Sequence, residues 1–409
     1  MKKHLFYLVI IGLTFSNLTT YSQISEAEWR NDIDQAKEVV FNKHKNAFTV
    51  SSREELEEGF TNLKNSVGQL DDARIKVQLA VIIAKIGDSH TGLGIEKGSL
   101  FPFSFYWFSD GIFVLAAAED LGNYLGWKLA GINGNDIESV CESLAEFIPH
   151  ENDAQLKSQI PAYLVYPEVL YGLGIIPTRE KCEYALVDSE GKQSLVMVNA
   201  IQGSAIGTFA KNMKKLIPDE RPDSYWETSA PYWRFHMKEE KTMLVNYNSC
   251  RNSPDQSFAV FTKEVFKIID DNDVSRLIID LRQNGGGNSM VFNPMLKAIK
   301  DHPRLNREGR LFVLIGRRTF SSAILNSIDL RQETEAIFIG EPTGGKPNHF
   351  GEVKSETLKN SGLQLYYSTK YFKSSEEDTD SFMPDHEVST SFDEYMIGLD
   401  MAFELALSL

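Results

Sequence analysis

The most constraining feature of this chain is a short apolar run that leads straight into a serine-rich helix start. Leu311–Ile315 has the pattern of a buried strand, and Ile324 and Ile328 follow at helical spacing. Between them, residues 318–323 read Arg-Thr-Phe-Ser-Ser-Ala, with Ser321 near the centre. A serine at such a junction lies at a helix N-terminus, where free backbone N–H groups favour an alkoxide or an oxyanion. The same pattern also describes an ordinary helix cap, so other segments of the chain are needed to distinguish a catalytic serine from a capping one.

The rest of the C-terminal part alternates strand and helix patterns. Strands are predicted at 243–246, 277–281, 311–315 and 336–339, and helices at 258–270, 290–299, 322–330 and 395–407. Such alternation predicts a mixed sheet with helical cover, in an α/β domain that we place at residues 241–409.

The N-terminal segment has the composition of a signal peptide. Lys2 and Lys3 precede a mostly apolar stretch, residues 5–15, which is too short to span a bilayer. Cleavage after Ser22 would leave a mature chain beginning near residue 23, and no cysteine stands there to carry a lipid. The sequence therefore predicts an exported protein, periplasmic or secreted, without a transmembrane segment in the mature chain.

Three further regions precede the α/β domain. Residues 23–95 read as helical, with a capping box at Ser52, and end in the loop Gly-Asp-Ser-His-Thr, which carries His90. Residues 96–205 are β-rich, with a hairpin-type turn at Asn133-Gly134. Residues 206–240 are polar and contain several prolines, which indicates a connection.

Composition limits the classes of function. A chain of 409 residues has room for two or three domains, and its net charge of -15 argues against nucleic acid and anionic membranes as partners. Its cysteines, Cys141, Cys182 and Cys250, are too widely spaced for a metal knuckle. We therefore expect buried thiols, no metal and no cofactor.

Several short segments, taken in order, resemble the S41 serine peptidases, which include the tail-specific (C-terminal processing) proteases and the tricorn core protease. The segments are Asp88-Ser89-His90-Thr91, Asp280-Leu281-Arg282 followed by Asn284–Gly287, residues 318–323, Gly340–Gly345 and Pro384-Asp385. The resemblance implies a crotonase-like mixed-sheet catalytic domain, a PDZ-like β-rich insert at 96–205, and a peptide or protein substrate. It also implies Ser321 as the nucleophile.

The family divides by its general base, and this chain carries features of both branches, although Ile324 stands where the tail-specific branch often has an acidic residue. Lys346 stands at the spacing of the Ser-Lys dyad of tail-specific enzymes, whereas Ser89-His90 resembles the Ser-His loop of the tricorn branch. Imidazole titrates near neutrality, while a lysine needs strong desolvation to lose its proton at pH 7. The prediction is His90 as base, with the Ser321-Lys346 dyad as the alternative and His349 as the third choice.

The remaining site residues follow from the chemistry and from the resemblance. An oxyanion needs two converging donors, and the backbone N–H groups of Ser322 and of Gly285 or Gly286 are candidates. Ser89 is a candidate to assist or orient the catalytic residues. The resemblance also implies a late acidic residue, for which Asp378 is chosen and Asp380 or Glu377 are alternatives.

Other functions stay open at this point. An esterase would use the same nucleophile, although the Gly-x-Ser-x-Gly elbow is absent around Ser321. Some relatives resemble apolar-ligand carriers without catalysis, and the β-rich insert can itself be the working part of a scaffold. The sequence leaves the oligomeric state and the cleavage specificity undetermined.

Overall fold

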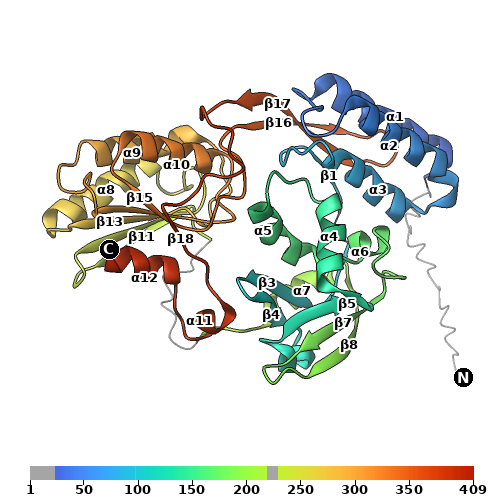
Figure 1. The fold of residues 1–409 in the computed structure, drawn as a ribbon, viewed down its shortest axis with the longest axis horizontal. Helices are drawn as coiled ribbons and strands as arrows, with labels where there is room; N and C mark the ends of the chain where they lie inside the picture. The colour runs from blue at the N-terminus through green and yellow to red at the C-terminus, as the bar shows by residue number, and fades with distance from the viewer. Residues whose placement is uncertain (1–23, 97, 219–228) are drawn as a thin grey trace, which may run out of the picture.

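The computed structural model describes residues 24–96, 98–218 and 229–409. The predicted signal peptide at 1–22 lies outside these residues. Figure 1 shows an α/β lobe from the C-terminal part of the chain, a bundle of N-terminal helices and a β-rich module beneath that bundle. In the described part of the chain, no helix is long and apolar enough to cross a membrane.

The N-terminal bundle consists of α1 (Glu26–Lys43), α2 (Arg53–Ser66) and α3 (Asp72–Ala84), with a 3-10 turn η1 (Val67–Gln69). Ser25 and Ser52 each form a full capping box, and the Asp71 side chain caps α3. Gly87, at φ 71°, turns the chain after α3 into the His90 loop. The capping box expected at Ser52 is therefore confirmed.

The C-terminal sheet has the order β11-β12-β13-β14-β15-β18. Its strands are β11 (Tyr232–Met237), β12 (Thr242–Tyr247), β13 (Arg276–Asp280), β14 (Leu311–Ile315), β15 (Ile337–Gly340) and β18 (His386–Glu387). Pairing is parallel from β12 to β18, whereas β11 runs antiparallel to β12. The sheet thus begins before the predicted limit at residue 241, because β11 lies in the segment that we expected to be a connection.

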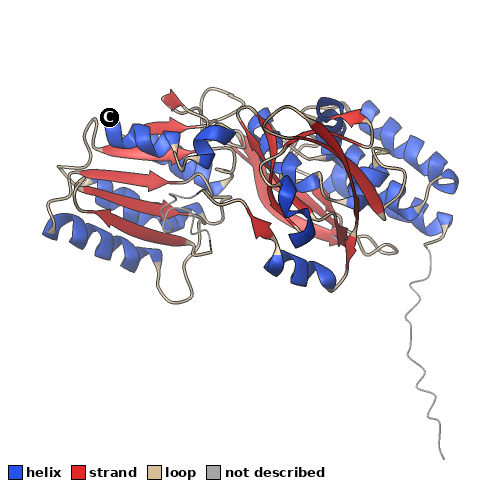
Figure 2. Ribbon diagram, turned by 90° about the horizontal axis from the view of Figure 1, so that it is seen from below, coloured by secondary structure: helices blue, strands red, loops and turns tan. Residues whose placement is uncertain are grey.

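Helices cover both faces of this sheet (Figures 1 and 2). One face packs against α8 (Phe258–Asp271), the 3-10 turn η4 (Ser289–Phe292), α9 (Asn293–Lys300) and α10 (Ser322–Glu333). The other packs against α12 (Met401–Ser408). Successive strand residues point to opposite faces, so Val313 joins the first core and Phe312 the second.

The predicted final helix is wrong in one respect. Instead of one helix over 395–407, the chain forms α11 (Phe392–Met396) and α12. Gly398, at φ 77°, interrupts the helix, and the Asp400 side chain then caps α12 through the Phe403 N–H.

The β-rich module is built on a sheet of order β10-β4-β5-β7-β8, with β3 beside β4 and β6 beside β5. Its strands are β3 (Phe103–Phe108), β4 (Gly111–Ala117), β5 (Lys128–Ile132), β6 (Asn135–Asp136), β7 (Lys181–Val187), β8 (Gln193–Asn199) and β10 (Lys214–Lys215). The turn at Asn133 and Gly134 has both φ values positive, as predicted for this hairpin.

Helices in and beside this module were not assigned from the sequence. They are η2 (Glu119–Tyr124), α4 (Ile137–Phe147), α5 (Asp153–Tyr163), α6 (Pro167–Gly172) and α7 (Ala205–Asn212), and a short pair joins β2 (Ser99–Leu100) to β9 (Ile201–Gln202). The predicted connection at 206–240 therefore contributes part of α7 and β10 as well as β11. Helix α5 packs against β3.

A β-hairpin arm crosses from the α/β lobe to the N-terminal bundle (Figure 1). It consists of β16 (His349–Thr357) and β17 (Gln364–Phe372), and β17 pairs with β1 (Gly92–Gly94), directly after the His90 loop. Leu358, Leu365 and Tyr367 are buried in the core of the N-terminal helices. The predicted segment 241–409 therefore includes an arm that packs with the N-terminal bundle.

Candidate active site

Ser321 stands at the junction of β14 and α10 in a strained backbone conformation. It is the N-cap of α10, with φ 54° and ψ −125°, a region that non-glycine residues rarely adopt. The Phe320 N–H donates to Asn284 O at 3.0 Å, which ties this loop to the glycine-rich segment after β13. A Cβ on Gly286 would lie 2.8 Å from the Ser321 Cβ, so only glycine permits this approach.

His90 is brought to Ser321 from the N-terminal bundle. Its Nε2 lies 3.2 Å from the Ser321 Oγ, across 231 residues of sequence. The loop is fixed by Asp88, a fully buried carboxylate that accepts from the His44 Nε2 at 2.9 Å, from the Thr91 hydroxyl and from the His90 N–H at 2.9 Å. Hydrogen bonds to the ionised form outweigh the effect of burial and lower the pKa of Asp88.

His90 is held as a neutral imidazole. Burial lowers its pKa to about 4, against a smaller opposing effect of the Asp88 charge. The Nδ1 atom is buried and has no hydrogen-bond partner among the described residues, and the Asp88 Oδ1 is 3.8 Å away. A neutral ring with its proton on Nδ1 leaves the Nε2 lone pair free to accept the serine proton.

Glu151 completes the site, and sequence reasoning did not find it. It lies just before the N-cap residue of α5, Asn152. Its carboxylate accepts from the Ser89 hydroxyl at 2.7 Å and from the backbone N–H of Lys346 at 2.9 Å. Burial raises the pKa of Glu151 to about 7. No local pattern around Glu151 signals this role, because its partners come from distant segments.

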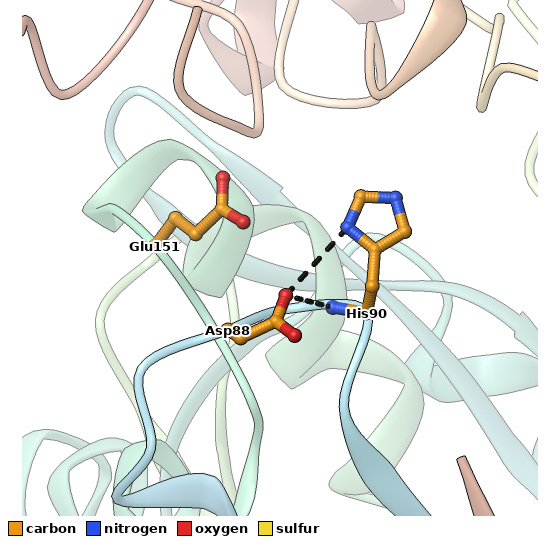
Figure 3. A group of neighbouring side chains, drawn as sticks. All are labelled: Asp88, His90 and Glu151. Carbon is orange, nitrogen blue, oxygen red and sulfur yellow. Dashed lines mark hydrogen bonds and ion pairs between the residues drawn. The ribbon is translucent and has the colours of Figure 1, made fainter. Parts of the chain in front are cut away.

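Figure 3 shows Asp88, His90 and Glu151 together, with the Asp88 carboxylate contacting the His90 backbone and ring. One ligand atom from each lies within 4.8 Å of the others, which is a spacing that can hold a metal ion. A metal would take the Nδ1 lone pair of His90 and force the ring proton onto Nε2. Metal binding here and proton acceptance at Nε2 therefore exclude each other.

Lys346 and Asp378 lie nearby but do not contact the His90 ring. The Lys346 Nζ pairs with Asp380 at 2.7 Å. Burial alone would lower the pKa of Lys346, yet Asp380 and the other nearby carboxylates raise it. The Asp378 carboxylate accepts a long 3.5 Å hydrogen bond from the Asn348 side chain. Lys346 therefore touches the site through its backbone N–H on Glu151, while its amine stays protonated.

The predicted oxyanion donors surround Ser321 but are not equivalent. The Gly286 N–H already donates to the Asn284 Oδ1 at 2.9 Å. No acceptor is described, within the described ranges, for the backbone N–H of Ser322 or of Gly285. The Ser322 hydroxyl donates to Gly287 O at 2.7 Å, which ties the start of α10 to the glycine-rich segment.

Two cavities open between the β-rich module and the α/β lobe. One, of about 670 Å³, is polar, and Glu151, Lys157, Arg317 and Asp380 are among its lining residues. The other, of about 600 Å³, lies between β3, α5 and the carboxyl edge of the C-terminal sheet, and it is largely apolar. Ser321 lines neither cavity, but Glu151 places the polar one directly beside the His90 loop.

Comparisons with known proteins give one family match and several likenesses of fold. Residues 241–388 match the family model of peptidase family S41. Mature CPAF complexed with lactacystin superposes with a TM-score of 0.67 at 13% identity, over 94% of this chain and 97% of that one. Mature CPAF alone gives 0.64 at 12% identity, over 94% and 96%. No curated protein matches the chain at the level of sequence.

A putative peptidase from Parabacteroides merdae superposes with a TM-score of 0.50 at 13% identity, over 93% of this chain and 96% of that one. At such identities these likenesses establish the shared fold. The family match adds the class: residues 241–388 match peptidase family S41, and the protein is a peptidase. The predicted family and the predicted α/β class are therefore confirmed.

Proposed function

We propose that this protein is an exported serine endopeptidase in which Ser321 is the nucleophile and His90 the general base. The observation that carries the proposal is the 3.2 Å contact between the His90 Nε2 and the Ser321 Oγ. A serine hydroxyl is a weak nucleophile and needs such a base within hydrogen-bond reach. The strained backbone of Ser321 supports the same role, because strain of this kind clusters at functional sites.

The reaction proceeds by acyl transfer. Ser321 Oγ attacks the peptide carbonyl carbon while His90 Nε2 takes its proton, and the same proton then goes to the leaving amine. Water, deprotonated by His90, releases the acyl group. The backbone N–H groups of Ser322 and Gly285 are the proposed oxyanion donors, since the Gly286 N–H is occupied by Asn284.

Asp88 and Glu151 are the carboxylates proposed to support the imidazolium that forms on His90. The Asp88 Oδ1 lies 3.8 Å from its Nδ1, and one oxygen of Glu151 lies within 4.8 Å of a His90 ring nitrogen. A buried imidazolium without a nearby negative charge would be costly. Asp378, chosen from the family resemblance, has no described contact with the His90 ring and is not proposed for this role. Ser89 is proposed to orient Glu151 through its 2.7 Å hydrogen bond.

The Ser-Lys dyad is the competing mechanism. It requires a deprotonated Lys346, whereas the contact of its amine with Asp380 stabilises the charged form. His90→Ala should lower kcat/KM by about 10⁴-fold, and Lys346→Ala by less than about tenfold. The reverse order would show that the lysine is the base.

The function is tested with the predicted mature chain, residues 23–409, and a mixed peptide library, with products identified by mass spectrometry. Cleavage by wild type and none by Ser321→Ala is expected. A fluorophosphonate probe and simple esters, used in parallel, separate the alternatives. Ester hydrolysis without peptide cleavage would indicate an esterase, and an unreactive Ser321 would indicate a ligand-binding relative.

Export is proposed from the predicted signal peptide at residues 1–22. N-terminal sequencing of the protein recovered outside the cytoplasm should begin near residue 23, and an unprocessed protein retained in the cytoplasm would contradict export.

The β-rich module is a second candidate for peptide binding, in the manner of a PDZ domain. This is tested by truncating a side chain that lines its cavity, for example with Phe105→Ala, and measuring KM for long and short peptides.

A further inference from the structure

Two other aromatic rings stack on the His90 ring. Phe320 stacks on it with ring centroids 4.6 Å apart and planes 24° apart. His349 also stacks on it, at 5.6 Å and 14°. Phe372 in turn stacks on His349, at 5.5 Å and 24°. The four rings, in the order Phe320, His90, His349 and Phe372, are here called the ring column.

The local sequence is adapted to this column. A Cβ on Gly345 would lie 2.8 Å from the Phe320 ring, and a Cβ on Gly351 would lie 3.1 Å from the Phe372 ring. His349 is 4% exposed, and its Nδ1–H donates to the carbonyl of Lys346 at 3.0 Å. His349 is also paired with Phe372 in the register of β16 and β17. The plane of the His349 ring is therefore fixed by the backbone of the arm.

The His90 ring lacks the hydrogen bond that usually orients a catalytic imidazole. In the Ser-His-Asp arrangement a carboxylate bound to Nδ1 sets the rotation of the ring. Here the His90 Nδ1 has no hydrogen-bond partner in the part of the chain that the structure describes, and the nearest Asp88 oxygen is at 3.8 Å. The constraint on its rotation comes from the two ring faces, because a turn of the imidazole would collide with Phe320 and His349.

We propose that His349 is a positioning residue: it holds the His90 imidazole in the plane in which Nε2 faces the Ser321 Oγ. The proposal rests on the proposed function of Ser321 and His90 and adds a residue to which neither the resemblance nor the comparisons give a role. His349 does not touch the reacting atoms and acts only through His90. The arm thereby contributes directly to catalytic geometry, in addition to anchoring β1.

The contribution of the ring is separated from that of the imidazole chemistry by two substitutions. His349→Phe keeps a flat ring against His90, whereas His349→Ala opens one face of the column. His349→Ala should lower kcat by about 10- to 100-fold with KM changed less than about twofold, since a small misplacement of a reacting group has effects of this size. His349→Phe should stay within about threefold of wild type. An equal loss in both variants would contradict the proposal.

The pH profile gives a readout that a general loss of folding would not move. The charged and titratable groups that face His90 are Asp88, Glu151 and His349 itself. Opening the column admits water to His90, so the acid limb of kcat/KM should move to higher pH in His349→Ala. It should move less in His349→Phe, which keeps His90 covered and removes only the smaller repulsion by the His349 charge. A loss by the same factor at every pH would show that His349 has only a structural role.

A second measurement does not depend on turnover. Diethyl pyrocarbonate modifies accessible histidines, and mass spectrometry reports each site. Modification of His90 should be about tenfold faster in His349→Ala than in wild type and unchanged in His349→Phe. The exposed His386 serves as the internal control, with equal rates in all variants. Unchanged His90 reactivity in His349→Ala would overturn the proposal. A different outcome would separate the two proposals. If the wild type cleaved no peptide while modification of His90 was still faster in His349→Ala, the positioning role of His349 would stand and the proposed reaction would be refuted.

Discussion

The proposed nucleophile, Ser321, and the proposed base, His90, reach the same point by different means. Ser321 lies where β14 runs into α10, and its geometry depends on short, neighbouring segments: the strand, the helix and the glycine-rich turn after β13. His90 lies on a loop whose position depends on three remote parts of the chain. These are His44 on Asp88, β17 beside β1, and the arm packed into the N-terminal core.

This difference divides the site into a nucleophile half, which is Ser321 with the segments around it, and a base half, which is His90 with its loop. It predicts how substitutions in each half affect stability and activity. The strands under Ser321 are fully buried and are covered by helices on both faces, so local substitutions should disturb geometry more than stability. The base half depends on contacts between segments hundreds of residues apart. Loosening one of those contacts should therefore cost stability and activity together, because the His90 loop moves with the arm.

Among substitutions that leave the proposed nucleophile and base in place, the largest expected effect comes from Gly286→Ala in the nucleophile half. A Cβ there would stand 2.8 Å from the Ser321 Cβ, at a φ of 101° that alanine adopts only with strain. We expect kcat to fall about 100-fold, with a stability loss of about 1–3 kcal/mol. Steady-state kinetics and urea unfolding measure both.

Gly316→Ala is the matched control for that substitution. Gly316 directly follows β14, its φ is not in the left-handed region, and an added Cβ would make only ordinary contacts, the nearest at 3.6 Å. Its kinetics should stay close to wild type. Equal losses in the two variants would show that the nucleophile half is sensitive everywhere, and the contrast with the base half would then fail.

The next largest effect is expected for Asp32, a residue of α1 that accepts hydrogen bonds from the tip of the arm. This buried carboxylate accepts from the Asn360 N–H at 3.0 Å, the Asn360 side chain at 2.8 Å and the Ser361 N–H at 2.7 Å. Asp32→Ala removes the acceptor for these donors and should cost about 2–4 kcal/mol. Hydrogen exchange should also rise in β17 and in the His90 loop.

Asp34→Ala on the same helix is the control, because Asp34 is exposed and pairs only with Lys64 at the surface among the described residues. Its unfolding free energy should change by less than about 0.5 kcal/mol. If Asp32→Ala destabilised the protein without altering exchange around His90, the arm and the base would be uncoupled.

The pH dependence of activity tests whether His90, which with Glu151 is one of two buried titrating groups of the site, is shielded from water. Because burial lowers the pKa of His90 to about 4, the base stays neutral well below pH 6.5, and kcat/KM should decline only as pH falls towards 4–5. An acid limb centred at 6.5 would show that the ring is solvated.

Stability should change with pH in opposite directions for these groups. His90 binds protons more readily when unfolded, so its contribution to stability decreases as pH falls from 6.5 towards 4. Glu151, with a pKa raised to about 7, binds them more readily when folded, so its contribution decreases as pH rises from 4.5 to 7. Glu151→Gln should therefore make stability rise more steeply with pH over that window, by roughly 1–3 kcal/mol. Urea unfolding at several pH values measures this slope, and an unchanged slope would contradict the assignment.

The smallest effect is expected for the surface ion pair of Lys43 and Glu356, between α1 and the arm. Both side chains are substantially exposed, so a double-mutant cycle should give a coupling of about 0–0.5 kcal/mol that weakens with salt. A coupling above 1 kcal/mol would mean that charge at the surface, in addition to Asp32 and the apolar core, attaches the arm.

Sequence reasoning succeeded where structure is local and failed where it is not. The strand at 311–315, the cap at Ser52 and the turn at Asn133-Gly134 depend on neighbouring residues, and the structure has each as predicted. The arm was read as part of a continuous C-terminal domain, since an alternating pattern specifies a hairpin but not the body against which it packs. Glu151 was missed for a similar reason.

The sequence by itself indicated the family, through the resemblance of its short motifs. It also determined the α/β class and the junction that holds Ser321, because short-range periodicity, caps and glycines encode them. It also nominated His90, through its loop and the family resemblance. Only the tertiary structure placed Glu151 beside Ser89 and set His349 on the face of His90. It also paired Lys346 with Asp380, and it placed Asp378 away from the His90 ring. These relations depend on how the arm and the β-rich module dock, and docking is decided by buried surfaces summed over the whole chain rather than by any local pattern.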